Sequence, residues 1–160
     1  MQIWLSSRVP RLKKFLLYWL PLFAWMGIIF TASGDADSAR HSSIYFEPLV
    51  HWLFPSMSQA HVEELHYAFR KGCHMMEFAI LAVLAWRAVR QPTRNDLRPW
   101  RWAEAGLSLA IVLLYAASDE LHQVFIPSRT GQISDVVVDV IGGTIGLTLL
   151  WLAGKKFRCW

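Results

Sequence analysis

Residues able to do acid–base or binding chemistry gather in three short stretches of this chain. Each stretch lies beside a long apolar run, and its polar residues recur at intervals of three or four positions, which on a helix places them on one face. Residues of these types can exchange protons, bind charged groups or ligate a metal ion. The candidate binding residues are Lys71, His74, Glu77, Gln123, Arg129, Asp135 and Asp139, and the candidate catalytic residues are Asp119, Glu120 and His122.

The second stretch favours acid–base catalysis. Asp119, Glu120 and His122 directly follow an apolar run, so one of them could act as the acid or base on a membrane-bound substrate. Nucleophilic Ser–His–Asp chemistry is disfavoured, because Ser118 does not lie in a Gly-x-Ser-x-Gly turn. The competing structural interpretation is that Asp119 and Glu120 only mark the boundary between the apolar run and water.

A divalent metal ion is an open alternative as a cofactor. The histidines and carboxylates of the three stretches are suitable ligands, but His74-x-x-Glu77 lacks the second histidine of the zincin motif. His74 and Glu77 could equally be a pair at a helix boundary. Asp139 is harder to explain in that way, because an ionised Asp near the middle of a span costs about 2.5–3.5 kcal/mol. It should therefore face protein or water rather than lipid.

Four apolar runs predict an all-α membrane bundle. Hydrophobic residues make up 54% of the 160 residues and the mean hydropathy is +0.29, which is too apolar for an average soluble domain. The fourth run is rich in β-branched residues, but it is too long for one strand and no partner strands are available for a barrel. The predicted transmembrane helices cover Phe15–Ala32, Cys73–Val89, Trp102–Ala117 and Ile133–Ala153.

The first apolar run has two interpretations. Basic residues precede it and the small residues Ala32, Ser33 and Gly34 follow it, as in a signal peptide with its cleavage site. The run is longer than the hydrophobic region of a typical signal peptide and is rich in aromatic residues, which favours a retained span. Pro21 lies inside the run, and a membrane helix tolerates this when its neighbours satisfy the freed carbonyl.

The distribution of Lys and Arg orients the bundle, because cytoplasmic segments of membrane proteins carry the excess of these residues. Here they crowd residues 1–14, residues 154–160 and the connection between the second and third runs. We therefore expect both termini in the cytoplasm and residues 33–70 and 120–132 outside. All three polar stretches then lie at the outer face, so the sequence predicts that they form one outward-facing site.

The predicted organisation has three parts. A basic cytoplasmic N-terminus covers residues 1–14, a transmembrane domain covers 15–153, and a cytoplasmic tail covers 154–160. The net charge of +4 is attributed to membrane anchoring because the basic residues flank the apolar runs. The expected partner is thus the lipid bilayer rather than nucleic acid.

The outer segment between the first two runs also predicts structure. Ile44–Phe54 is apolar but too short to span, so it could lie at the interface or re-enter the membrane. Ser58 is suited to cap a short helix in which Val62 and Phe69 share a face. That helix would run into the second span near Arg70.

Three isolated features have structural interpretations. Gly142 and Gly146 form a small-xxx-small pattern that predicts a helix-packing surface. Glu104 is expected to pair with Arg101 or a neighbouring Arg. Cys73 and Cys159 fall on opposite sides of the predicted membrane, so they should not form a disulfide.

Three motifs together resemble those of one family of membrane proteins. Residues 70–81 contain Lys-x-x-His-x-x-Glu-Phe, residues 118–131 contain Ser-Asp-Glu-x-x-Gln and then Pro-x-Arg-x-Gly, and residues 134–143 contain Asp-x-x-x-Asp-x-x-Gly. This combination is similar to the signature of VanZ-like proteins, and the resemblance extends over nearly the whole chain. It implies a multi-pass protein of the bacterial plasma membrane.

The resemblance gives a context but no reaction, substrate or cofactor. The family's founding member is linked to low-level resistance to the glycopeptide teicoplanin. One open interpretation is an enzyme or binding protein for a lipid-linked envelope precursor or a glycopeptide at the outer leaflet, with Arg129 holding an anionic group. A second is a non-enzymatic scaffold whose polar residues only lock the helices together. A small transporter is a third, although four short spans leave little room for inverted repeats.

Overall fold

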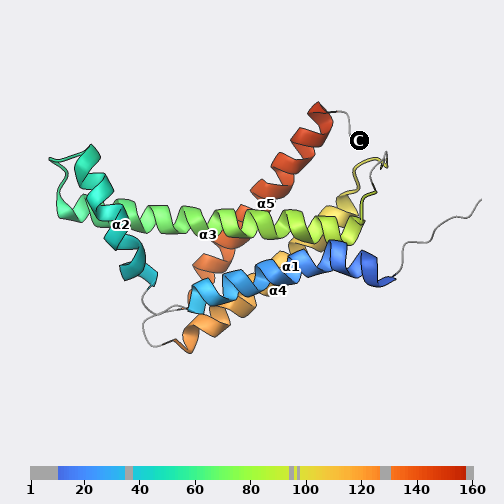
Figure 1. Cartoon of the computed structure of the whole chain (residues 1–160), viewed down its shortest axis with the longest axis horizontal. Coiled ribbons are helices and arrows are strands. Elements are labelled where there is room, and N and C mark those ends of the chain that lie inside the picture. The colour runs from blue at the N-terminus through green and yellow to red at the C-terminus, as the bar shows by residue number, and fades with distance from the viewer. Residues whose placement is uncertain (1–10, 35–37, 94–95, 97, 127–130, 158–160) are drawn as a thin grey trace, which may run out of the picture.

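Five helices make up most of the described chain. The computed structural model describes residues 11–34, 38–93, 96, 98–126 and 131–157, and Figure 1 shows how the helices are arranged. These residues contain no strand, so the predicted all-α class is confirmed. The helices are α1 (Arg11–Gly34), α2 (Ser38–Leu53), α3 (Gln59–Arg90), α4 (Trp102–Val124) and α5 (Ile133–Lys156).

Four of these helices, α1, α3, α4 and α5, are long and apolar enough to cross a membrane. Each contains one predicted span, so the prediction of four spans is confirmed. α3 is much longer than its predicted span, because the predicted outer helix and the second span form one continuous helix. Its 32 residues extend for about 48 Å at ~1.5 Å per residue, whereas the hydrocarbon of a bilayer is about 30 Å thick.

The start of α3 differs from the prediction in one detail. Ser58 immediately precedes the helix, as expected, but its side chain makes no capping hydrogen bond to the backbone. Its hydroxyl instead lies 2.7 Å from His61 Nδ1. In a cap the serine oxygen accepts a hydrogen bond from a backbone N–H of the first turn, whereas here the Ser58 hydroxyl is turned toward the imidazole.

α2 packs against the first half of α3, which it crosses steeply in Figure 1. Ser42 Oγ lies 2.8 Å from His66 Nε2. The Phe46 ring stacks on the His66 ring at 5.1 Å and lies 4.9 Å from the Phe69 ring, measured between centroids. Most of the apolar segment Ile44–Phe54 therefore belongs to a helix outside the four candidate spans.

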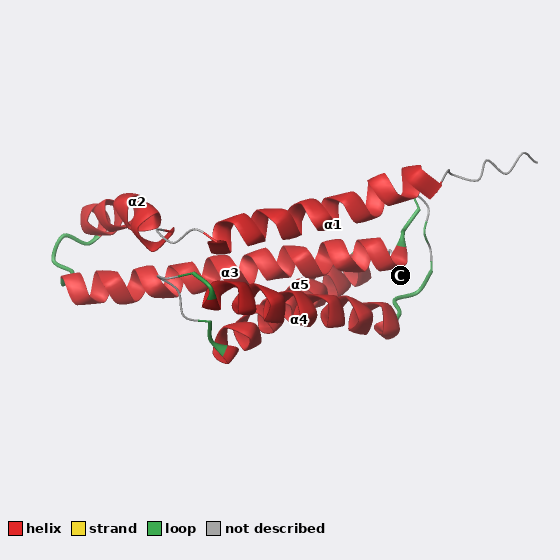
Figure 2. Cartoon of the chain, turned by 90° about the horizontal axis from the view of Figure 1, so that it is seen from below, coloured by secondary structure: helices red, strands yellow, loops and turns green. Residues whose placement is uncertain are grey.

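Hydrogen bonds from aromatic side chains to backbone carbonyls fix the direction of α1. They place the start of α1 beside the end of α3, and its later part beside α4, so α1 and α4 run one way and α3 runs the other. Figure 2 shows these helices side by side. The bonds are Tyr18 Oη to the Pro92 carbonyl at 2.5 Å, Trp25 Nε1 to the Glu77 carbonyl at 2.9 Å, and Tyr115 Oη to the Met26 carbonyl at 2.5 Å.

Glycines bring α3 and α5 into direct backbone contact, and these two helices run in the same direction. A Cβ at Gly146 would lie 2.5 Å from the Ala79 carbonyl oxygen, and a Cβ at Gly142 would overlap the backbone of Met75. Both glycines are buried. The predicted packing surface of Gly142 and Gly146 is therefore confirmed, with α3 as its partner.

The bundle is apolar both inside and outside. Phe78, Leu81 and Val112 are fully buried in the core between the helices. Large apolar residues also face outward, such as Leu114 in α4, which is 72% exposed. An apolar exterior over the length of the spans suits contact with lipid chains, which solvate such side chains as well as a protein core does.

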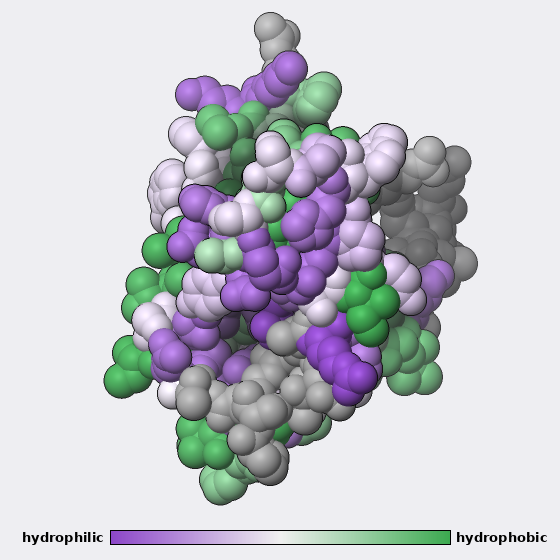
Figure 3. All heavy atoms as spheres, turned by 90° about the vertical axis from the view of Figure 1, so that its left-hand side faces the viewer, coloured by the Kyte–Doolittle hydropathy of each residue, from purple (hydrophilic) through white to green (hydrophobic). Residues whose placement is uncertain are grey.

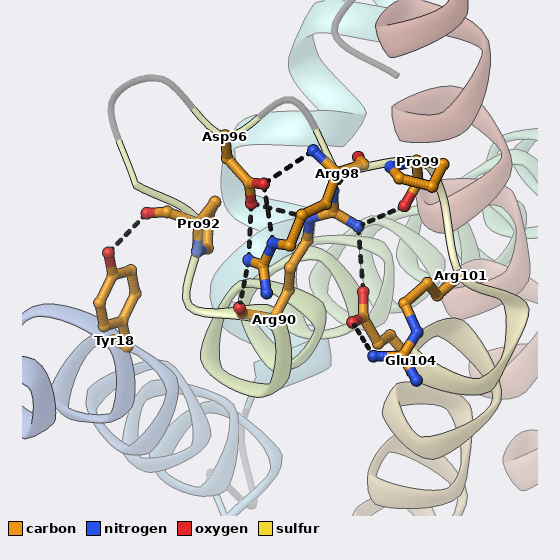
Figure 4. A network of polar contacts seen from close by, with 8 residues as sticks. All are labelled: Tyr18, Arg90, Pro92, Asp96, Arg98, Pro99, Arg101 and Glu104. Atoms are coloured by element: carbon orange, nitrogen blue, oxygen red, sulfur yellow. Dashed lines mark hydrogen bonds and ion pairs between the residues drawn. The ribbon is translucent and has the colours of Figure 1, made fainter.

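A buried arginine fastens the connection between α3 and α4 (Figure 4). Arg90 is 4% exposed and donates to the carboxylates of Asp96 at 3.2 Å and Glu104 at 3.1 Å. It also donates to the carbonyls of Pro99, at 3.1 Å, and Arg98. Burial of a guanidinium is tolerable when acceptors, two of them carboxylates, occupy most of its five donors in this way.

The same network confirms the predicted pairing of Glu104, which accepts from both Arg90 and Arg101. Arg98 donates two hydrogen bonds from its side chain to the Asp96 carboxylate. These bonds hold the pKa of Asp96 well below its usual range and raise the pKa of Arg98. Cys73 is a free thiol, and Cys159 lies outside the described residues.

We expect Gly146→Ala to lower the free energy of unfolding by about 1–3 kcal/mol, the usual cost of overpacking a filled interface. The added methyl group would have to displace the α3 backbone. Thermal unfolding in detergent micelles measures the effect. Gly106→Ala in α4 is the matched control, because nothing lies within 4 Å of a Cβ there. Equal melting temperatures for the two variants would contradict the close contact.

We expect Asp96→Asn to lower the melting temperature at pH 7, and the difference from wild type to shrink as the pH falls below about 4. The folded state depresses the pKa of Asp96, so its contribution is present above the unfolded pKa and is lost as the pH falls through the lowered, folded value. Melting curves across this pH range measure it. Glu64→Gln, which removes an exposed carboxylate of α3, should give a small difference throughout. A constant difference between Asp96→Asn and wild type would argue against the linkage.

Candidate functional site

Asp119 joins the end of α1 to α4. Its side chain lies in α4 and is 2% exposed. Ser33 Oγ, from the last turn of α1, donates to Asp119 Oδ1 at 2.5 Å. Gln123 Nε2, one turn further along α4, donates to Asp119 Oδ2 at 3.1 Å. Each carboxylate oxygen therefore has its own donor.

Glu120 joins the end of α4 to the start of α5. It is 7% exposed, and its Oε2 accepts a hydrogen bond from the Gln132 backbone N–H at 2.8 Å. Gln123 Nε2 lies 3.3 Å from Glu120 Oε1. A Cβ at Gly131 would lie only 2.6 Å from the Glu120 carbonyl oxygen, so the connection can approach the helix this closely because residue 131 is a glycine.

An ion pair joins α3 to α5 at the edge of the cluster. Lys71 Nζ contacts Asp135 Oδ2, and both side chains are partly exposed. Lys71 Nζ also lies 5.5 Å from the centre of the Tyr67 ring. One turn along α3, His74 Nδ1 lies 3.5 Å from Glu77 Oε2. Of the three residues predicted to share a face of α3, Lys71 thus pairs with α5, whereas His74 and Glu77 lie close to each other within α3.

Asp139 lies deeper in the bundle, one turn beyond Asp135 and one turn before Gly142. It is 3% exposed, and within the described part of the chain no hydrogen bond or ion pair reaches its carboxylate. It is nevertheless close enough to several charged side chains to interact with them electrostatically. These are Glu120, Asp119, Asp135 and Lys71.

His122 turns toward α1. Its ring stacks on the Phe30 ring with 4.1 Å between the centroids. Its Cε1 lies 3.3 Å from the position of a Cβ on Gly34, so a larger residue at 34 would press on the imidazole. His122 Nδ1 is buried without a hydrogen-bond partner among the described residues. The imidazole therefore packs against the last turns of α1.

The structure thus brings most of the candidate residues together from three helices. Among the residues that it describes, no three His, Cys, Asp or Glu side chains are grouped so as to hold a metal ion. Arg129 lies outside the described residues. Sequence reasoning missed Ser33, which it considered only as part of a cleavage site. We call the residues that are brought together here the polar cluster; they are Ser33, Lys71, Asp119, Glu120, Gln123, Asp135 and Asp139.

The polar cluster lies toward the end of the bundle where α1 and α4 end and α5 begins. Figure 3 views the molecule from that end, and hydrophilic residues occupy much of the middle of this face while apolar residues gather at its margins. Carboxylates buried beneath such a face can bind hydrogen-bond donors or cations, or can hold protons.

The fold and the polar cluster define a small multi-pass membrane protein with ionisable residues buried between its spans. The chain belongs to the VanZ/LLP1 family, whose model matches residues 16–154. The match includes nearly all of α1 and α5 and everything between them. No curated protein and no solved structure matches the chain.

We expect Ser33→Ala to lower the free energy of unfolding by about 1–3 kcal/mol, because it leaves a buried oxygen of Asp119 without its donor. The melting temperature in detergent measures the loss. The matched control is Ser118→Ala, since the exposed Ser118 hydroxyl bonds only the Tyr115 carbonyl of its own helix. If the two alanine variants melt together, the bond between α1 and Asp119 contributes nothing.

Proposed function

We propose that this chain is a bacterial plasma-membrane protein that binds, and acts on, a lipid-linked or cell-envelope molecule at the outer leaflet. The observation that carries the proposal is the burial of three carboxylates between apolar helices. Asp119, Glu120 and Asp139 are 2%, 7% and 3% exposed. Ionisable residues inside membrane bundles are costly and mark binding or proton-transfer sites. Bonds from α1, from α4 and from the residue before α5 hold Asp119 and Glu120 in place, which pre-organises this part of the cluster.

The charge distribution supports the outer location. Arg87 and Arg90 lie in the last turn of α3, and Lys155 and Lys156 in the last turn of α5. These residues are at the end of the bundle opposite the polar cluster, and the positive-inside rule assigns that end to the cytoplasm. Both termini are then cytoplasmic, and the polar cluster opens to the outer leaflet.

Membership of the VanZ/LLP1 family and the resemblance to VanZ support an envelope molecule as the ligand. A glycopeptide such as teicoplanin, or a lipid-linked precursor of the cell wall, would approach at the partly exposed edge marked by Lys71 and Asp135. Arg129 follows the polar stretch of α4 and would hold an anionic group of the ligand. Transfer of the molecule across the membrane is not part of the proposal.

A second candidate is a scaffold without catalysis, and specific contacts favour it. The bond from Ser33 to Asp119 ties α1 to α4, and the bond from the Gln132 N–H to Glu120 ties α5 to α4. Polar side chains that fasten helices in this way need no ligand. The two candidates differ in what happens when a carboxylate loses its charge but keeps its shape.

The test compares lipids and cell-wall precursors from cells with the wild-type protein, with Asp119→Asn, and without the protein. We expect the wild type to change the profile, and Asp119→Asn to return it to that of cells without the protein while the variant stays folded at the growth temperature. Growth in teicoplanin is a second readout and should follow the same order. Glu64→Gln, which removes an exposed carboxylate outside the polar cluster, should behave as wild type.

Two results would reject the proposal. Identical profiles and identical growth in all strains would reject action on an envelope molecule. A loss of effect in Asp119→Asn that follows a matching loss of thermal stability would favour the scaffold instead.

A further inference from the structure

Asp139 differs from the other buried carboxylates in having no hydrogen-bond or ion-pair partner among the described residues. Asp119 and Glu120 each accept hydrogen bonds on both carboxylate oxygens. Asp139 is buried to a similar degree, at 3% exposed, yet no described donor reaches it. A buried polar group that the fold leaves unsatisfied calls for an explanation of its own.

Contact with lipid or bulk water does not explain the missing partner, because Asp139 is buried beside the contact between α5 and α3. Asp139 lies on the face of α5 that carries Gly142 and Gly146, and this face is in backbone contact with α3 at Met75 and Ala79. Because residues four apart share a helix face, Asp139 lies between that contact and the ion pair of Asp135. The neighbouring helices leave only 3% of Asp139 exposed.

An ionised carboxylate at this position would be strongly disfavoured. Within the described ranges it would have no donor to replace its hydration, which a buried anion requires. The described charges that act on it are mostly of its own sign, and the cation among them, Lys71, is already paired with Asp135. The titratable and charged groups that the packed elements carry toward this end of the bundle include Lys71, Cys73, His74 and Glu77 on α3, Tyr115, Asp119, Glu120 and His122 on α4, and Asp135 on α5, with Arg129 outside the described residues.

We propose that Asp139 holds an exchangeable proton and is the residue of the polar cluster that passes it to the bound molecule, while Asp119 and Glu120 are positioning residues. The inference rests on the proposed function for the identity of the acceptor. In the step, the O–H bond of Asp139 breaks as its proton bonds to an oxygen or nitrogen of the molecule, and the electron pair stays on the carboxylate. Water then returns a proton by way of the partly exposed Asp135, one helical turn away.

Infrared spectroscopy of the full-length protein in lipid nanodiscs tests the proton directly, because a protonated carboxyl group has a C=O stretch that a carboxylate lacks. At pH 7 we expect one such band in the wild type, shifted in deuterium oxide and lost in Asp139→Asn. The control Glu64→Gln, which removes an exposed carboxylate outside the polar cluster, should keep the band. Absence of the band from the wild type, or its persistence in Asp139→Asn, would overturn the proposal.

Stability and envelope profiles test what the proton is used for. Asn replaces a neutral acid by a neutral amide of the same shape, so Asp139→Asn should keep the wild-type melting temperature and yet give the profile of cells without the protein. Asp139→Glu, which keeps an acid, should restore part of the wild-type profile. A wild-type profile from Asp139→Asn, or its failure to fold, would overturn the transfer step. If wild-type and protein-free cells do not differ, the proposed function fails, and the infrared result still decides whether Asp139 holds the proton.

Discussion

The backbone contact between α3 and α5 is the constraint on which the rest of the structure depends. Gly142 and Gly146 have no side chains to keep the helices apart, so α5 lies directly on the backbone of α3. That approach covers Asp139 one turn earlier and brings Asp135 to Lys71 one turn before that. With larger residues at the two glycine positions, the helices would separate and the acidic face of α5 would open. The depth of the polar cluster is therefore set by residues that have no functional groups.

The two ends of the bundle handle buried charge in opposite ways. At one end Arg90 is surrounded by two carboxylates and two carbonyls, and its burial is compensated throughout. At the other end Asp139 is buried without any described donor. A buried charge whose hydrogen bonds are made within the protein stabilises the fold. A buried carboxylate without such bonds is costly, and a proton or a bound ligand relieves that cost. By this contrast, Arg90 is a candidate for a structural role and Asp139 for a functional one.

Much of the fold could be predicted from the sequence, because apolar length and glycine spacing are local signals. The four spans and the Gly142–Gly146 surface follow from them, and so does the continuation of the outer helix into the second span, since no proline interrupts residues 59–90. The organisation of the polar cluster could not. Ser33 becomes the donor to Asp119 only because α1 and α4 end at the same level, which is a tertiary relation. The distinction between Asp119 and Asp139 is likewise invisible in residue type, since it depends on which carboxylate the fold supplies with donors.

The anchoring of α1 has an evolutionary consequence. Trp25 and Tyr115 each donate a hydrogen bond to a backbone carbonyl on another helix, and Tyr18 donates to the carbonyl of Pro92, just after α3. Every residue has a carbonyl, so the accepting positions can change identity without losing the bond, whereas the donors cannot. Such contacts leave no correlated substitutions between the two positions that they join. Homologous sequences could therefore diverge widely in α1 while the helix kept its place. Its position depends on a few aromatic donors, and their acceptors are backbone carbonyls rather than side chains.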